Sequence, residues 1–213
     1  MPIIYNDLYQ FNSYISPINL SFHQYLLLTD EPVLVHTGSI QQTENLIPQL
    51  KEVLVDKKLK YIFVSHFESD ECGGLSLLLK TFPEAKTICS EITARQLIGF
   101  GITDEVIIKK PGEKLTSSDY ELEFFSYPSE MHLWEGILLM ENNRGIFFSS
   151  DLIFGMGKFN GEVINGNWQK EVANITLEQI PSTEQRAKVQ QTLSELDPKF
   201  AALINTTSPS LLV

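Results

Sequence analysis

Short apolar runs alternate with amphipathic stretches through the first half of this sequence, and this alternation limits the possible folds more than any other feature. Residues 61–64 form a continuous apolar run, which suits a strand buried on both faces. Leu46, Leu50 and Leu54 recur at helical intervals, which predicts the apolar face of a helix. The strands predicted in this half are residues 25–28, 33–35, 61–64, 86–89 and 106–108, and the predicted helices are residues 43–55, 75–79 and 91–100. This order indicates a largely parallel sheet with helices packed on it.

The second half has shorter connections and predicts a second sheet. Residues 142–144 have the composition of a hairpin turn. Ser182 and Gln185 have the spacing of a helix N-terminus, which predicts a last helix. The strands predicted in this half are residues 120–127, 136–140, 145–148 and 200–204. We therefore expect an α/β fold, a four-layer αββα sandwich, in which residues 1–213 form a single domain with one shared core.

The charge balance excludes some classes of function. The chain has 16 basic and 27 acidic residues, a net charge of −11, which disfavours binding to nucleic acid or to an anionic membrane surface. We find neither an apolar stretch of the roughly 20 residues needed to span a bilayer nor the features of a secretory signal. The two cysteines, Cys72 and Cys89, are too few for a disulfide framework and are expected to pack as apolar side chains. We therefore expect a cytoplasmic protein.

Potential metal ligands cluster directly after the apolar run 61–64. His66, Glu68 and Asp70 alternate with other residues, so an extended loop would turn all three side chains to one side, with Glu71 adjacent. The carboxyl end of a strand in such a sheet is a common place for a ligand site. Imidazole and carboxylate donors together suit iron, manganese or zinc. The alternative interpretation is a solvated acidic loop whose histidine merely ends the strand.

Two more potential ligands follow predicted strands in the second half. His132 comes after the strand that ends at Tyr127, and Asp151 comes after residues 145–148. Donors at the ends of separate strands are what a metal centre at a sheet edge requires, and these two positions favour the metal site over the solvated loop.

These motifs resemble the metallo-β-lactamase superfamily. The pattern consists of His66-x-Glu68-x-Asp70 after an apolar strand, His132 near Trp134, and Asp151 followed by a glycine at position 155. The resemblance is to the diiron domain of flavodiiron proteins and their free-standing oxygen-binding relatives. The glutamate at position 68 distinguishes this branch from zinc hydrolases, which usually have histidine there.

The resemblance implies two iron sites. The first would contain His66, Glu68 and His132, with Asp151 as a bridge, and the second would contain Asp70, Asp151 and Glu71. Two features depart from the pattern. Glu71 occupies a position where the family has histidine, and no histidine follows the last predicted strand. The second site is therefore expected to bind its metal weakly, or to be empty.

The function that the resemblance implies is binding or slow reduction of dioxygen or nitric oxide by a non-haem diiron protein. We find no flavodoxin-like module and hence expect no bound FMN, so electrons would come from a separate flavoprotein or a rubredoxin-like donor. A homodimer is the assembly that the resemblance suggests. One alternative is a zinc-dependent hydrolase, which Glu68 disfavours because a further carboxylate lowers the acidity of a metal-bound water. Another is a degenerate member that serves as a sensing or interaction module.

Two histidines remain outside the predicted ligand set. His36 lies at the end of the strand 33–35, in a position where the superfamily commonly has a structural aspartate. We interpret it as a core histidine with satisfied hydrogen bonds, in preference to a group placed behind the metal loop. His23 has no recognisable partner in the sequence and is expected to have no special role.

Overall fold

The structure is a computed structural model that describes residues 3–128, 135–153, 158, 163–202 and 210–213. Its described strands form two seven-stranded sheets. The first sheet contains β1 (Ile3–Tyr5), β2 (Leu8–Ile15), β3 (Leu20–Leu27), β4 (Val33–Val35), β5 (Tyr61–Phe63), β6 (Lys86–Cys89) and β7 (Val106–Ile108), in this order. The second sheet, in spatial order, contains β12 (Val163–Asn165), β14 (Ser210–Leu212), β13 (Phe200–Ala202), β11 (Ile146–Phe148), β10 (Gly136–Glu141), β9 (Glu121–Tyr127) and β8 (Lys114–Thr116).

The first sheet combines an antiparallel meander with a parallel half. β1 to β4 pair antiparallel, whereas β4 to β7 pair parallel. The parallel half confirms the prediction from the sequence. The hairpin of β2 and β3 was not predicted, because polar residues such as Gln10 and Asn12 interrupt its apolar pattern.

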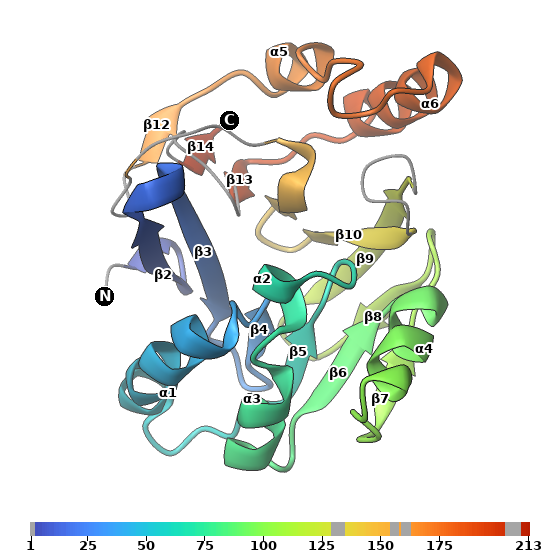
Figure 1. Cartoon of the computed structure of the whole chain (residues 1–213). Coiled ribbons are helices and arrows are strands. Elements are labelled where there is room, and N and C mark those ends of the chain that lie inside the picture. The colour runs from blue at the N-terminus through green and yellow to red at the C-terminus, as the bar shows by residue number, and fades with distance from the viewer. Residues whose placement is uncertain (1–2, 129–134, 154–157, 159–162, 203–209) are drawn as a thin grey trace.

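Helices cover the outer face of each sheet. Figure 1 shows α1 and α3 side by side over the first sheet and α5 with α6 over the second. The α-helices are α1 (Ile40–Leu54), α2 (Ser69–Cys72), α3 (Leu75–Thr81), α4 (Glu91–Gly99), α5 (Trp168–Ala173) and α6 (Thr183–Ser194), and the 3-10 helices are η1 (Ser16–Ile18) and η2 (Ser150–Leu152). None of the helices in the described ranges is both long and apolar enough to cross a membrane.

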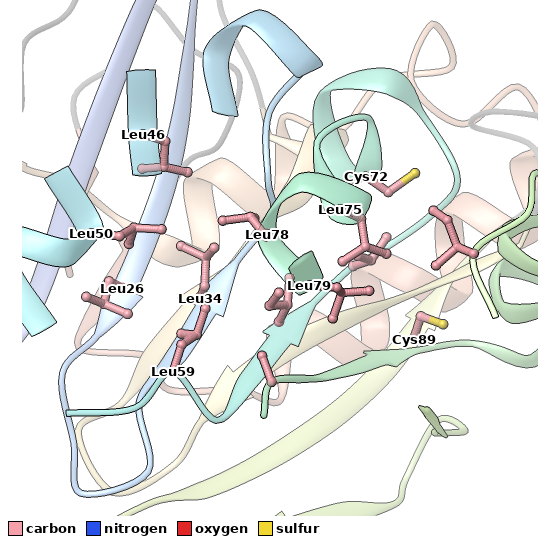
Figure 2. Close-up of a cluster of buried hydrophobic side chains, with 14 of the residues drawn as sticks. Leu26, Leu34, Leu46, Leu50, Leu59, Cys72, Leu75, Leu78, Leu79 and Cys89 are labelled. Atoms are coloured by element: carbon pink, nitrogen blue, oxygen red, sulfur yellow. The ribbon is translucent and has the colours of Figure 1, made fainter. Parts of the chain in front are cut away.

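Three apolar clusters separate the four layers. Tyr25 and Phe63 of the first sheet meet Phe124 and Phe148 of the second in the central cluster. Neighbouring strand residues point the opposite way, because successive side chains of a strand alternate between its faces. Figure 2 shows Leu26 and Leu34 in the cluster beneath the helices, with Leu46, Leu50, Leu59, Leu75, Leu78, Leu79, Cys72 and Cys89. A third cluster lies between the second sheet and α5 and α6. The predicted αββα sandwich is confirmed.

Both cysteines lie within this apolar interior, as expected. Cys72 and Cys89 are buried free thiols, and burial raises the pKa of each to about 12. A thiol with so high a pKa has little thiolate at neutral pH and is a poor nucleophile or metal ligand.

Local capping signals determine where two of the helices begin. Ser39 and Gln42 form a capping box, so α1 begins at Ile40, earlier than the predicted residue 43. The Oγ atom of Ser182 accepts a hydrogen bond from the backbone N–H of Gln185 at 3.2 Å, which confirms the predicted start of α6.

Candidate metal centre

The segment after β5 becomes helical at Ser69 and is therefore not extended throughout. Glu68 is the N-cap of the single-turn helix α2, and the N–H of Cys72 donates to the carbonyl of Glu68 at 3.0 Å. Residues three apart lie on the same side of a helix, so Glu71 lies on the side of Glu68. The predicted extended loop is therefore wrong. The helical turn of α2 places Glu71, and not Asp70, as the second carboxylate near His66.

Four of the six predicted ligands lie close together. His66, Glu68, Glu71 and Asp151 each offer a donor atom, and these atoms all lie within 4.8 Å of one another. Nε2 of His66 is 3.1 Å from Oε2 of Glu68, 3.7 Å from Oε2 of Glu71 and 3.5 Å from Oδ2 of Asp151. Figure 1 shows α2, the helix that contains Glu71, near the upper ends of β4 and β5.

The other two predicted ligands are Asp70 and His132. Asp70 adjoins the cluster, and its charge acts on Glu71, but it is not among the four residues that can share one ion. His132 lies outside the described residues, as do Glu130 and Trp134 beside it.

A hydrogen-bonded pair of serines joins the two ligand-bearing loops. The hydroxyls of Ser65 and Ser150, each directly before a clustered residue in the chain, are 2.8 Å apart. Ser65 also contacts Nδ1 of His66 at 2.9 Å. This contact leaves Nε2 as the ring nitrogen of His66 that faces the carboxylates.

The electrostatics of the cluster favour a bound cation. Glu71 is fully buried, and burial, followed by the charges of Asp151, Asp70 and Glu68, raises the pKa of its carboxyl well above the usual value. Several carboxylates held together and partly out of water repel one another unless a positive charge compensates them. One imidazole and three carboxylates are donors that iron or manganese accepts. The residues present therefore fit a metal ion.

Solvent reaches the cluster from the side of Glu68. The side chain of Glu68 is 46% exposed, whereas those of His66 and Glu71 are 1% and 0% exposed. The ring of Tyr127 packs edge-on against the ring of His66, with centroids 5.3 Å apart. The cluster is therefore open to solvent at Glu68 and enclosed by protein at His66.

Sequence reasoning missed Ser65, Ser150, Tyr127 and Gly136 near the cluster. A β-carbon at Gly136 would lie 2.4 Å from the carbonyl oxygen of Ser65, so only glycine allows β10 to approach so closely. The N–H of Ile137 donates to the same carbonyl at 2.9 Å. Tyr127 ends a predicted strand, and the predicted ligands follow the ends of such strands. Its position in the sequence could therefore have indicated that it lies near the site.

His36 differs from its predicted role. It is fully buried, yet neither ring nitrogen has a hydrogen-bond partner among the described residues. Its Nδ1 lies 3.8 Å from Oε1 of Glu71. Burial, followed by the charge of His66, lowers the pKa of His36 well below its usual value, so the ring is neutral. The interpretation as a satisfied core histidine is therefore wrong.

Comparison with known protein families supports the resemblance seen in the sequence. Residues 20–202 match the model described as ODP family beta lactamase. The chain belongs to this family. Nitric oxide reductase from Moorella thermoacetica is 32% identical over 71 residues, which are 33% of this chain and 18% of that protein. This ODP family chain spans about a quarter of the length of several curated relatives that it matches.

Solved structures share the fold of this ODP family chain. The rubredoxin oxygen:oxidoreductase from Desulfovibrio gigas has a TM-score of 0.79 at 18% identity, covering 99% of this chain and 57% of that chain. The flavodiiron protein from Giardia intestinalis has a TM-score of 0.77 at 16% identity, covering 97% of this chain and 54% of that chain. The predicted likeness to the diiron domain of flavodiiron proteins is thus confirmed for the fold.

Proposed function

We propose that this chain is a non-haem iron protein that binds or slowly reduces dioxygen or nitric oxide. The observation that carries the proposal is the convergence of His66, Glu68, Glu71 and Asp151 within 4.8 Å. The names of the relatives, among them a nitric oxide reductase and an oxygen oxidoreductase, indicate the class of small molecule. Iron bound there would supply an open coordination position and an exchangeable electron.

The clustered side chains would hold the ion from different sides. His66, Glu71 and Asp151 would hold the ion from the protein side, because they are largely buried. The half-exposed Glu68 would close the side open to solvent. Tyr127, whose pKa is raised by burial and then by the charge of Asp151, keeps its proton and offers a neutral hydroxyl. We propose His132 as a further ligand.

We also propose an external source of electrons. The matched region, residues 20–202, is the part of the chain that carries the cluster. A flavodiiron protein and a rubredoxin oxygen:oxidoreductase are among the solved structures that share this fold. A separate flavoprotein or a rubredoxin-like protein would therefore supply the electrons for repeated turnover.

The decisive experiment measures iron in the purified chain. The protein is loaded with ferrous iron without oxygen, freed of excess metal by gel filtration and analysed for metal per chain. We expect at least one iron per chain in the wild type, a large loss in His66→Ala and His132→Ala, and no loss in His23→Gln. His23 is a matched control because it is 1% exposed, like His66, but lies outside the cluster.

The contrary outcomes are equally clear. Iron-free wild-type protein after loading would indicate the degenerate module, and equal iron in all variants would refute the ligand assignment. Zinc retention with ester hydrolysis would indicate the hydrolase. If the proposal is correct, adding nitric oxide to the iron-loaded wild type changes its visible absorption spectrum, and the same addition leaves His66→Ala unchanged.

A further inference from the structure

We propose that His36 is a positioning residue that holds the Glu71 carboxylate toward the candidate metal site. The inference deepens the proposed function and rests on it. It assigns a role to a buried histidine that is not one of the predicted ligands.

Glu71 lies between two imidazole rings. Its Oε1 lies 3.8 Å from Nδ1 of His36, and its Oε2 lies 3.7 Å from Nε2 of His66. His36 is not among the residues that can share one ion. One carboxylate oxygen therefore faces the cluster, and the other faces His36 behind it.

The ring of His36 and the carboxylate of Glu71 are incompletely hydrogen-bonded among the described residues. Neither ring nitrogen of His36 has a hydrogen-bond partner among the described residues. The carboxyl of Glu71 interacts with Asp70, but its oxygens have no other hydrogen-bond partner there. A buried polar group left unpaired costs about 1–3 kcal/mol. A closure of about 1 Å between Nδ1 and Oε1 would bring them within hydrogen-bond distance. Such a bond would use one oxygen of Glu71 and leave the other for a cation, as is common for metal-binding carboxylates.

Backbone hydrogen bonds hold the segments of His36 and Glu71 together. The N–H of Thr37 donates to the carbonyl of Glu71 at 3.0 Å, and the N–H of Gly38 donates to that of Asp70 at 2.9 Å. The N–H of His36 donates to the carbonyl of Phe63 at 2.9 Å, and the imidazole ring of His36 stacks on the ring of Phe63.

His36 also has a backbone conformation that residues other than glycine rarely adopt. Its φ is +64°, in the left-handed region. Strain of this kind costs about 1–3 kcal/mol and is concentrated at functional sites.

The experiment compares two substitutions at position 36. His36→Ala removes the ring, whereas His36→Asn keeps an amide donor near the place of Nδ1 and tolerates a positive φ. The ferrous dissociation constant is measured without oxygen by competition with a chromophoric chelator, and the melting temperature of the metal-free protein is measured alongside. We expect His36→Ala to weaken iron binding by about 10- to 100-fold. We expect His36→Asn to restore most of the affinity and His23→Gln to leave it unchanged.

A double-mutant cycle separates positioning from simple packing. In a Glu71→Gln background, His36→Ala should change the dissociation constant by less than about twofold, because the partner that it positions is altered already. Full wild-type affinity in folded His36→Ala would overturn the inference while leaving the proposed function intact. An equal loss of iron affinity from His36→Ala in the wild-type and Glu71→Gln backgrounds would also overturn it. So would a failure of His36→Asn to restore the affinity. Absence of iron from the wild type would instead overturn the proposed function.

Discussion

At the scale of single residues, Ser65 makes two hydrogen-bonding contacts beside the candidate metal site. Its hydroxyl lies 2.9 Å from Nδ1 of His66 and 2.8 Å from the hydroxyl of Ser150. Ser150 has a φ of +48°, so its loop is strained where it approaches Asp151. One hydroxyl thus orients an imidazole and anchors the strained loop that presents a carboxylate.

We predict that Ser65→Ala weakens ferrous iron binding by about tenfold, because groups that orient metal ligands commonly contribute this much. Chelator competition measures the effect. Ser126→Ala is the control, since Ser126 is exposed on β9, and it should bind iron as the wild type does. Unchanged affinity in folded Ser65→Ala would show that the serine pair does not position His66.

At the scale of elements, the start of β10 presses against the loop that carries His66. A β-carbon at Gly136 would lie 2.4 Å from the carbonyl oxygen of Ser65 and 3.0 Å from the β-carbon of His66. The backbone of Ser65 cannot move away without losing the hydrogen bond from Ile137. The second sheet therefore sets the position of a ligand that follows a strand of the first.

We predict that Gly136→Ala lowers both the melting temperature of the metal-free protein and its iron content after loading. A clash of this size against backbone costs more than about 1 kcal/mol. Gly99→Ala is the control, because no heavy atom lies within 4 Å of its added β-carbon and alanine favours the helix. If Gly136→Ala keeps the wild-type melting temperature and iron content, the close approach is not required.

At the scale of the whole molecule, Arg144 joins the two sheets at the end of β10 away from Gly136. Its Nε and Nη2 donate to the two carboxylate oxygens of Asp7 at 2.6 and 2.7 Å, and its Nη1 donates to the carbonyl of Asp119 at 2.8 Å. The Arg144 side chain is 17% exposed. A paired contact of this geometry needs the planar guanidinium group.

We predict that Arg144→Lys lowers the free energy of unfolding by about 1.5–3 kcal/mol, which is typical for a lost charged hydrogen bond, while iron content stays at the wild-type value. Urea unfolding and metal analysis measure the two quantities. Arg95→Lys, in an exposed pair with Glu91, should change the stability by less than about 1 kcal/mol. Loss of iron in Arg144→Lys would contradict the separation of this contact from the cluster.

Much of the architecture could be predicted from the sequence because the relevant signals are local. The spacing of Leu46, Leu50 and Leu54 marks one face of a helix, and the run at 61–64 marks a buried strand. Donors that follow strands, such as His66 and Asp151, could be expected to meet, because the ends of neighbouring strands share an edge. The short strands β8 and β12 and the helix α5 were missed because none of them contains more than two consecutive apolar residues.

Local sequence determined which residues could act as donors and roughly where each would lie. Only the tertiary structure decided which of them meet. A single helical turn selects Glu71 over Asp70, and backbone pairing between distant loops places His36 behind it. These contacts join residues far apart in the chain, and their geometry depends on how two sheets and a one-turn helix pack. A pattern with a short period carries no information about such packing.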